Sequence, residues 1–539
     1  MLPKNRHKHG LVGIGQPLLD FTVPLTVERA QRLLQTCNQL RILQGAEFLR
    51  KSVEFSKDLF EEFTVGEEII SSPTTDMPTI LPGGATLNSL RVAQWLLDGH
   101  DATTFIGCIG DDAEGERLLD LIRICGVNPV LRLVHNERTA KCLHISTDDS
   151  ILHTLDPTIE SIKLHNTVDT YQLFYFPGAA NKITLSFLKR PEARFAIMSS
   201  TYILASLNMA YIPAGSNQKP YSNGDLCGPK LLIYLSKLAS SDNRIFCLRL
   251  PSSSSSKAGP TDSTVSVKAL SAPEWIDVLS NVDILFTDLG SALDVAQTLA
   301  DWNENDSTQQ RVSRPEIRRR FAEFAASVLL SEKRSPGTGK EGSGTNAYAS
   351  SLYEPMAQSL AATMPGLAER LGFCLANLPK RIGERARIVV IMGSGSASGG
   401  VVACTSTGQL YRLSDFVLPG PGYRNAEARP PFKGSQVTSV RIKLSGTVSR
   451  PYTGGFRKTG TPEEFLFRGN GTGKCADGFV GGVLAKLMNG SCLADTNNSL
   501  SEALLVGSRV AHLLSLDRAC SFPKRMPTEL RLAMSKVDP

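Results

Sequence analysis

A glycine-rich segment near the carboxyl end of the chain carries a carboxylate where phosphate chemistry is possible. Asp477 follows Lys474, Cys475 and Ala476, and a helical pattern begins at about the same place. The first N–H groups of a helix lack intrahelical partners, and together with the helix dipole they attract phosphate. A carboxylate at that point could accept the proton of a hydroxyl that attacks a phosphoryl group. It could equally be an ordinary helix cap.

Two upstream segments hold residues that could bind a polyhydroxy ligand. Asp20 follows a Pro-Leu-Leu turn, and a carboxylate can accept hydrogen bonds from both hydroxyls of a vicinal diol. Gly83 and Gly84 let the backbone approach a ligand closely, and Asn88 could hold a hydroxyl from the start of the next helix. Each feature also has a structural explanation: a turn-capping aspartate, a tight turn and a polar first-turn side chain.

These segments occur in the order found in the ribokinase-like (PfkB) family of carbohydrate kinases, and the chain resembles the adenosine kinases within that family. The matching segments are Gly13 to Asp20, Pro82 to Trp95, Phe105 to Gly115 and Asn470 to Gly482. In the third of these segments we expect Asp112 to cap the helix that follows. Within them, Val92-Ala93-Gln94-Trp95 favours adenosine kinases over sugar kinases, and so does Cys520-Ser521-Phe522-Pro523 further on.

The resemblance implies a reaction and a role for each matching residue. Asp477 is the expected catalytic base in the ATP-dependent phosphorylation of the 5′-hydroxyl of adenosine or a related nucleoside, a step of purine salvage. ATP and Mg²⁺ are the implied co-substrate and cofactor. The implied substrate-binding residues are Gln16, Asp20, Gly83, Gly84 and Asn88. The implied phosphate-binding residues, which form an anion hole, are Lys474, Cys475, Ala476 and Gly478.

Three departures from the family pattern support a second hypothesis. The family's Gly-Ala-Gly before the aspartate is Lys474-Cys475-Ala476, and its Asn-x-x-Glu magnesium motif is Asp288-Leu289-Gly290-Ser291, so no metal ligand is assigned. Its Gly-Phe-Phe, which stacks on adenine, is Gly178-Ala179-Ala180, and a ring contact of about 0.5–1.5 kcal/mol is lost. The alternative is a catalytically impaired pseudokinase that acts as a nucleotide-binding or protein-interaction scaffold. A different sugar or nucleoside substrate also fits the small residues.

Short apolar runs alternate with helical patterns along most of the chain. The runs predict strands buried on both faces, and the alternation predicts an α/β fold with a doubly wound, mostly parallel sheet and helices on both faces. The resemblance adds a small β lid. The predicted strands are 10–15, 102–109, 172–176, 244–248, 282–286 and 387–392, and the clearest predicted helices are 88–97 and 115–125.

The interruptions of this rhythm indicate insertions rather than domain boundaries. We expect a single ribokinase-like domain over residues 10–530, with lid segments near 20–80 and 130–155. Segments rich in Ser, Gly, Pro or Asn predict surface insertions that could engage a protein partner. These insertions are expected at about 206–232, 252–271, 333–352 and 412–463.

The overall composition narrows the classes of function. The 539 residues include 58 basic and 52 acidic side chains without a long basic run, which argues against nucleic-acid binding. The 11 cysteines are odd in number and contain no C-x-x-C pair, so we expect neither a disulfide framework nor a zinc site. No apolar run approaches membrane-spanning length, and we expect a cytoplasmic protein without membrane contact.

Overall fold

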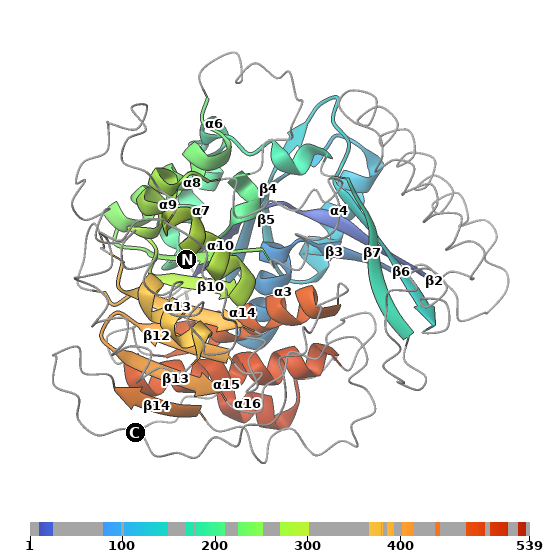
Figure 1. Cartoon of the computed structure of the whole chain (residues 1–539). Coiled ribbons are helices and arrows are strands. Elements are labelled where there is room, and N and C mark those ends of the chain that lie inside the picture. Colours follow the sequence, from blue (N-terminus) through green and yellow to red (C-terminus); the bar gives the residue numbers. More distant parts are fainter. Residues whose placement is uncertain are drawn as a thin grey trace, which may run out of the picture.

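Ten strands form the main sheet of the protein (Figure 1). The computed structural model describes residues 10–24, 79–98, 102–148, 168–176, 178–210, 225–251, 270–300, 366–378, 380, 385–392, 401–413, 437–441, 471–490, 496–515 and 526–534. In spatial order the strands are β14 (Val437–Arg441), β13 (Gln409–Leu413), β12 (Val401–Thr405), β11 (Ile388–Met392), β10 (Ile284–Asp288), β9 (Ile245–Arg249), β8 (Tyr202–Ser206), β1 (Leu11–Ile14), β4 (Thr103–Gly110) and β5 (Asn128–Val134).

Most of these strands run in the same direction. Every pair from β11 through β10, β9, β8, β1 and β4 to β5 is parallel, whereas β12, β13 and β14 continue the sheet antiparallel at one edge. The predicted α/β fold with a mostly parallel sheet is confirmed. The strand β14 lies within the segment predicted as an insertion at 412–463, so that segment contributes to the sheet.

Helices cover both faces of the main sheet and bury two separate cores. Successive residues of each parallel strand point to opposite faces, so Leu11 joins one core and Val12 the other. The first core is closed by α3 (Ala85–Leu97), α4 (Ala113–Ile124), α14 (Gly471–Asn489), α15 (Thr496–Ser515) and α16 (Thr528–Met534). The second is closed by α6 (Leu185–Leu188), α7 (Pro191–Ser199), α8 (Gly228–Ser241), α9 (Ala272–Leu279), α10 (Leu289–Ala300) and α13 (Leu367–Ala376).

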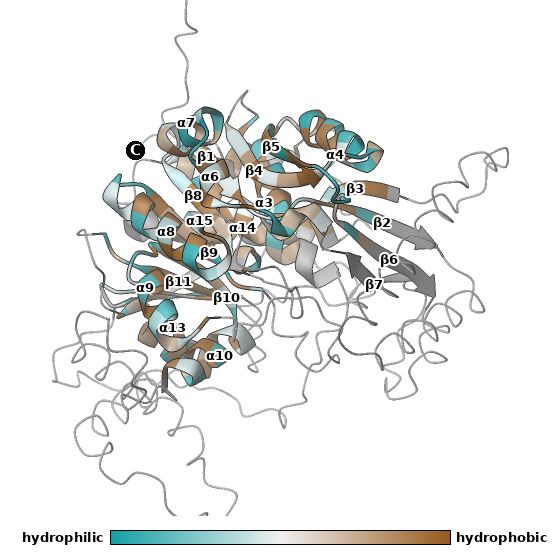
Figure 2. Ribbon diagram, turned by 90° about the horizontal axis from the view of Figure 1, so that it is seen from above, coloured by the Kyte–Doolittle hydropathy of each residue, from teal (hydrophilic) through white to brown (hydrophobic). Residues whose placement is uncertain are grey.

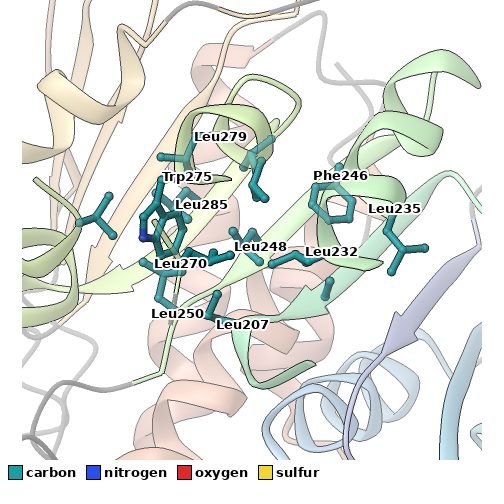
Figure 3. Close-up of a cluster of buried hydrophobic side chains, with 14 of the residues drawn as sticks. Leu207, Leu232, Leu235, Phe246, Leu248, Leu250, Leu270, Trp275, Leu279 and Leu285 are labelled. Atoms are coloured by element: carbon teal, nitrogen blue, oxygen red, sulfur yellow. The ribbon is translucent and has the colours of Figure 1, made fainter. Parts of the chain in front are cut away.

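Large side chains fill the second core (Figure 3). Trp275 of α9 lies beside Leu285 of β10, and Phe246 and Leu248 of β9 face the leucines of α8. Seen from above, hydrophobic residues concentrate where strands and helices meet, and hydrophilic residues lie on the outer surfaces of α4 and α7 (Figure 2). None of the described helices is both long and apolar enough to cross a membrane.

A second, four-stranded sheet projects from one side of the main sheet (Figure 1). It consists of β3 (Thr79–Gly83), β2 (Leu18–Pro24), β6 (Lys141–Asp148) and β7 (Val168–Phe176), in that order. The strands β2, β3 and β6 lie within or at the border of the segments expected to form the lid, 20–80 and 130–155, whereas β7 lies outside them. The expectation for residues 172–176 was wrong in one respect, because this strand pairs with β6 rather than joining the main sheet.

Asp112 connects the two sheets through a helix cap. Its Oδ1 accepts a hydrogen bond from the N–H of Gly115 at 2.8 Å, as predicted for the start of α4. Its Oδ2 accepts one from the N–H of Thr139 at 2.8 Å, two residues before β6 begins. One carboxylate therefore fixes both the helix start and the approach of the chain to the second sheet.

Several cysteines lie buried as free thiols in the two cores. Burial raises the pKa of Cys108 to about 12, and it also raises the pKa of Cys247, Cys374 and Cys404. Cys247 belongs to the first core and the other three to the second.

Three of the predicted insertions lie wholly or partly outside the described residues. The insertion at 333–352 lies wholly outside them, and so do residues 211–224 of the insertion at 206–232 and residues 252–269 of the insertion at 252–271.

Candidate active site

The carboxyl ends of four parallel strands bring polar residues to one edge of the main sheet. Gln16 follows β1, Asn208 follows β8, Arg249 ends β9 and Asp288 ends β10. Because these strands are parallel neighbours, the four residues share the edge at which open α/β sheets bind their ligands. The candidate site is therefore placed by the sheet and not by a single loop.

Asp477 lies in α14 at this edge and contacts α3 directly. Its Oδ2 accepts a hydrogen bond from the Nδ2 of Asn88 at 2.9 Å, and its backbone carbonyl accepts one from the Oγ of Ser89 at 3.0 Å. The Asp477 residue is only 4% exposed. Two residues that lie 389 positions apart in the sequence are thus brought into hydrogen-bond contact.

The helix that carries Asp477 begins earlier than the sequence predicted. We expected Asp477 at the helix start, but α14 begins at Gly471 and places this residue in its second turn. N–H groups beyond the first turn of a helix donate to carbonyls four residues back. The N–H groups of Cys475, Ala476 and Gly478 therefore lie within the helix and not in its first turn.

Glycines allow α14 to approach its neighbours closely. A Cβ at Gly481 would lie 2.6 Å from the Cβ of Val92 in α3, and one at Gly482 would lie 2.8 Å from the Cα of Gly507 in α15. Side chains of any size would push these helices apart. The Phe-Val-Gly-Gly sequence after Asp477 thus sets the distance between Asp477 and Asn88.

The predicted substrate-binding residues gather around the start of α3. Asp20 in β2 is buried, and its carboxylate lies so close to Gly83 in β3 that a Cβ at Gly83 would overlap it. Gly84 caps α3 with φ 107°, a conformation that favours glycine, and a side chain there would overlap the carbonyl of Gln16. Gln16, Asp20, Gly83 and Gly84 are therefore neighbours, and Asn88 lies one helical turn further on.

Arg249 is a site residue that the sequence analysis missed. It is 7% exposed, forms an ion pair with Asp477, and its Nη1 donates weakly to the carbonyl of Ala85 at 3.4 Å. Burial lowers the pKa of Arg249 to about 10, while the charge of Asp288 raises it. The side chain therefore stays cationic at neutral pH. Its signal in the sequence is a charge directly after the apolar run of β9.

A second cluster consists of three residues with amide side chains, Gln16, Asn181 and Asn208. The Nε2 of Gln16 donates to the Oδ1 of Asn181 and to the carbonyl of Asn208, the latter at 2.9 Å. The Nδ2 of Asn181 and the Oδ1 of Asn208 are buried without a hydrogen-bond partner among the described residues. Asn181 ends η2 (Gly178–Asn181), which contains the buried Ala179 and Ala180, and Asn208 lies in η3 (Leu207–Ala210). The region that was expected to lack an aromatic ring is lined with amides.

The described residues provide little for a protein-held metal ion. No three His, Cys, Asp or Glu side chains gather into a possible metal site in the described part of the chain. Asp288 accepts a hydrogen bond from the N–H of Ser291 at 2.6 Å and lies near the charge of Arg249. A carboxylate engaged in this way, beside a cation, does not fit a direct magnesium ligand.

One part of the chain matches a family of known proteins. Residues 71–186 match the model of the pfkB family of carbohydrate kinases. The curated relatives of this chain include adenosine kinases. Adenosine kinase 2 of Arabidopsis thaliana is 29% identical over 22% of this chain and 29% of its own length. Adenosine kinase of Saccharomyces cerevisiae is 27% identical over 31% of this chain and 47% of its own length. The matched part thus spans less than half of these relatives.

Solved structures with a similar course of the chain include adenosine kinases as well as sugar kinases. The Anopheles gambiae adenosine kinase in complex with P1,P4-di(adenosine-5) tetraphosphate covers 94% of this chain and 98% of its own, with 16% identity and a TM-score of 0.48. The apo adenosine kinase of Trypanosoma brucei brucei covers 94% of this chain and 98% of its own, with 14% identity and a TM-score of 0.47.

Proposed function

We propose that the protein phosphorylates a primary hydroxyl of adenosine or a related nucleoside or sugar, with ATP as the phosphate donor and Asp477 as the general base. The observation that carries the proposal is the contact between Asp477 and Asn88 at the ligand-binding edge of the sheet. Asn88 lies in the part of the chain that matches the pfkB kinases. The assignment of adenosine rests on the relatives, and purine salvage and a cytoplasmic location follow from it as further proposals.

The side chains near α3 have separate tasks in this proposal. Asp20 and Asn88 bind hydroxyls of the acceptor, and the backbone at Gly83 and Gly84 allows the acceptor to approach closely. Asp477 takes the proton of the attacking hydroxyl as its oxygen forms a bond to the γ-phosphorus. The bond from that phosphorus to the bridging oxygen breaks, and ADP leaves. Mg²⁺ would enter bound to the phosphates of ATP, and no step depends on a protein ligand to it.

The test is a coupled assay of the purified chain with ATP, Mg²⁺ and a panel of nucleosides and sugars. For an acceptor that turns over, the Asp477→Asn variant should lose about 10²-fold or more in kcat, because general base catalysis commonly contributes that much. Asp277→Asn is a matched control, since Asp277 pairs with Lys237 on the other face of the sheet. The proposal would be contradicted if the unaltered chain phosphorylates no acceptor faster than the Asp477→Asn variant does.

A second candidate function is a pseudokinase that binds nucleotide without transferring phosphate. The ion pair between Arg249 and Asp477 favours it, because the guanidinium occupies an oxygen of the expected base. The start of α14 at Gly471 favours it too, since it places the N–H groups of Cys475, Ala476 and Gly478 inside the helix. Binding of ATP without turnover in the same assay would support this function.

A further inference from the structure

A transferring phosphoryl group needs a cation or N–H donors beside Asp477. The expected anion hole lies inside α14, and the described residues form no metal cluster. Phosphoryl transfer depends mainly on alignment and on neutralisation of the charge on the phosphoryl oxygens. A cation at the same edge of the sheet would meet that need.

Arg249 is a buried cation that forms an ion pair with Asp477. Its guanidinium offers five N–H donors, yet only Nη1 has a described contact, with Asp477 and the carbonyl of Ala85. Its Nε is buried without a hydrogen-bond partner in the described part of the chain. On the other side of the ion pair, the Oδ1 of Asp477 accepts no ordinary hydrogen bond. The pair therefore leaves donor capacity unused inside the site.

A phosphoryl group is a stronger partner for this guanidinium than one carboxylate oxygen. Its oxygens can accept two parallel N–H bonds from the guanidinium plane, and such charge-assisted pairs are the strong ones. Arg249 remains cationic at neutral pH because its pKa is about 10. Movement of the guanidinium to phosphate would also leave the Oδ1 of Asp477 open to an acceptor hydroxyl.

We propose that Arg249 is a catalytic residue that exchanges its ion pair with Asp477 for the γ-phosphate of the bound donor, and so frees Asp477 only when that donor is present. This inference rests on the proposed phosphotransfer. The hydroxyl proton passes to Asp477, and the acceptor oxygen bonds to the γ-phosphorus. The bond between that phosphorus and the bridging oxygen breaks as ADP departs, and the Arg249 N–H groups donate to the transferring oxygens throughout.

The variants Arg249→Gln and Arg249→Lys test the proposal in two measurements. In the kinetic assay, Arg249→Gln should lose about 10²-fold in kcat, as expected when one transition-state donor is removed. Its acceptor KM should change less than about threefold, and Arg249→Lys should retain an intermediate kcat because it keeps the charge without the planar fork. A kcat of Arg249→Gln equal to or above that of the unaltered chain would overturn the proposal.

Calorimetric binding of ATP and ADP gives a readout that needs no turnover. Arg249→Gln should weaken ATP binding about 10-fold or more, as for loss of a charge-assisted hydrogen bond, and ADP binding much less. Equal losses for both nucleotides, or none, would contradict the role of Arg249 even if the chain proves inactive. If the chain shows no turnover but Arg249→Gln still loses affinity for ATP and not for ADP, only the proposed function is contradicted.

A matched control separates this role from folding. Arg412 is also a largely buried arginine in an ion pair, with both oxygens of Glu369 at 2.5 and 2.9 Å, and it lies in β13 away from the site. Arg412→Gln should lower thermal stability without changing the ratio of ATP to ADP affinity. If Arg249→Gln fails to fold, the comparison is made with Arg249→Lys, whose ATP affinity should then fall while ADP affinity holds.

Discussion

At the scale of single residues, buried amide groups gather at one end of the candidate site. The Nε2 of Gln16 donates to Asn181 and to the backbone carbonyl of Asn208. The Nδ2 of Asn181 and the Oδ1 of Asn208 have no hydrogen-bond partner in the described part of the chain. Unpaired buried polar groups are costly, and a bound ligand can supply the missing hydrogen bonds. A hydroxyl or a heterocycle edge that donates and accepts would satisfy both atoms.

Substitution of Asn208 by Ala should therefore weaken acceptor binding. One neutral hydrogen bond contributes about 0.5–1.5 kcal/mol, so the acceptor KM should rise about 3- to 10-fold with little change in kcat. Initial rates at varied acceptor concentration measure both constants. Asn243→Gly is the control, because Asn243 is exposed at the opposite end of β9. An unchanged KM for every acceptor would remove Asn208 from the site.

Sequence reasoning recovered some residues and missed others for identifiable reasons. The cap by Asp112 was predicted because an aspartate before a helical pattern has a local explanation. Arg249 was missed because its role depends on Asp477, which lies far along the chain. Asn181 and Asn208 were missed because each contacts Gln16, which also lies far along the chain. The elements that precede them also have no special composition. Local chemistry can be inferred from spacing, whereas contacts between distant segments need the sheet order.

At the scale of elements, α14 shows how packing overrides composition. Gly471 and Gly473 have poor helix propensity, and the sequence therefore placed the helix start near Asp477. The structure extends the helix back to Gly471. The rest of α14 is buried against α3 and α15, contacts that no window of sequence reveals.

The close approach of α14 and α15 gives a prediction for Gly482. A Cβ at this position would meet the Cα of Gly507 at 2.8 Å, so Gly482→Ala should separate the two helices. Overpacking of this kind costs about 1–3 kcal/mol, measurable by urea unfolding. Gly490→Ala is the matched control, because its nearest new contact would be an ordinary 3.6 Å. Equal stability of the two variants would show that the helices adjust without cost.

At the scale of the whole molecule, one sheet joins two cores. Alternate residues of the same strands fill both, so neither core can open without loss of the strands between them. Within the second core, the fully buried guanidinium of Arg387 joins two helices, because it donates to Leu279 at the end of α9 and to Leu375, Ala376 and Leu378 at the end of α13. We propose on this ground that the described elements form a single domain.

A single domain predicts that damage to either core affects the same unfolding transition. Phe479→Ala in the first core and Trp275→Ala in the second should each destabilise the protein by about 3–5 kcal/mol. Calorimetry should show one transition that moves to lower temperature in both variants. A second transition that responds to only one substitution would divide the chain into two domains.

The reactivity of the buried thiols can report when each of the two cores opens. A thiol reagent reacts with the thiolate, and a buried cysteine with a raised pKa stays protonated and out of reach until its surroundings open. Cys247 reports from the α14 side of the sheet, whereas Cys108, Cys374 and Cys404 report from the α9 side. Labelling rates followed site by site would thus time local fluctuations on each face of the native protein, with no mutation added to the chain.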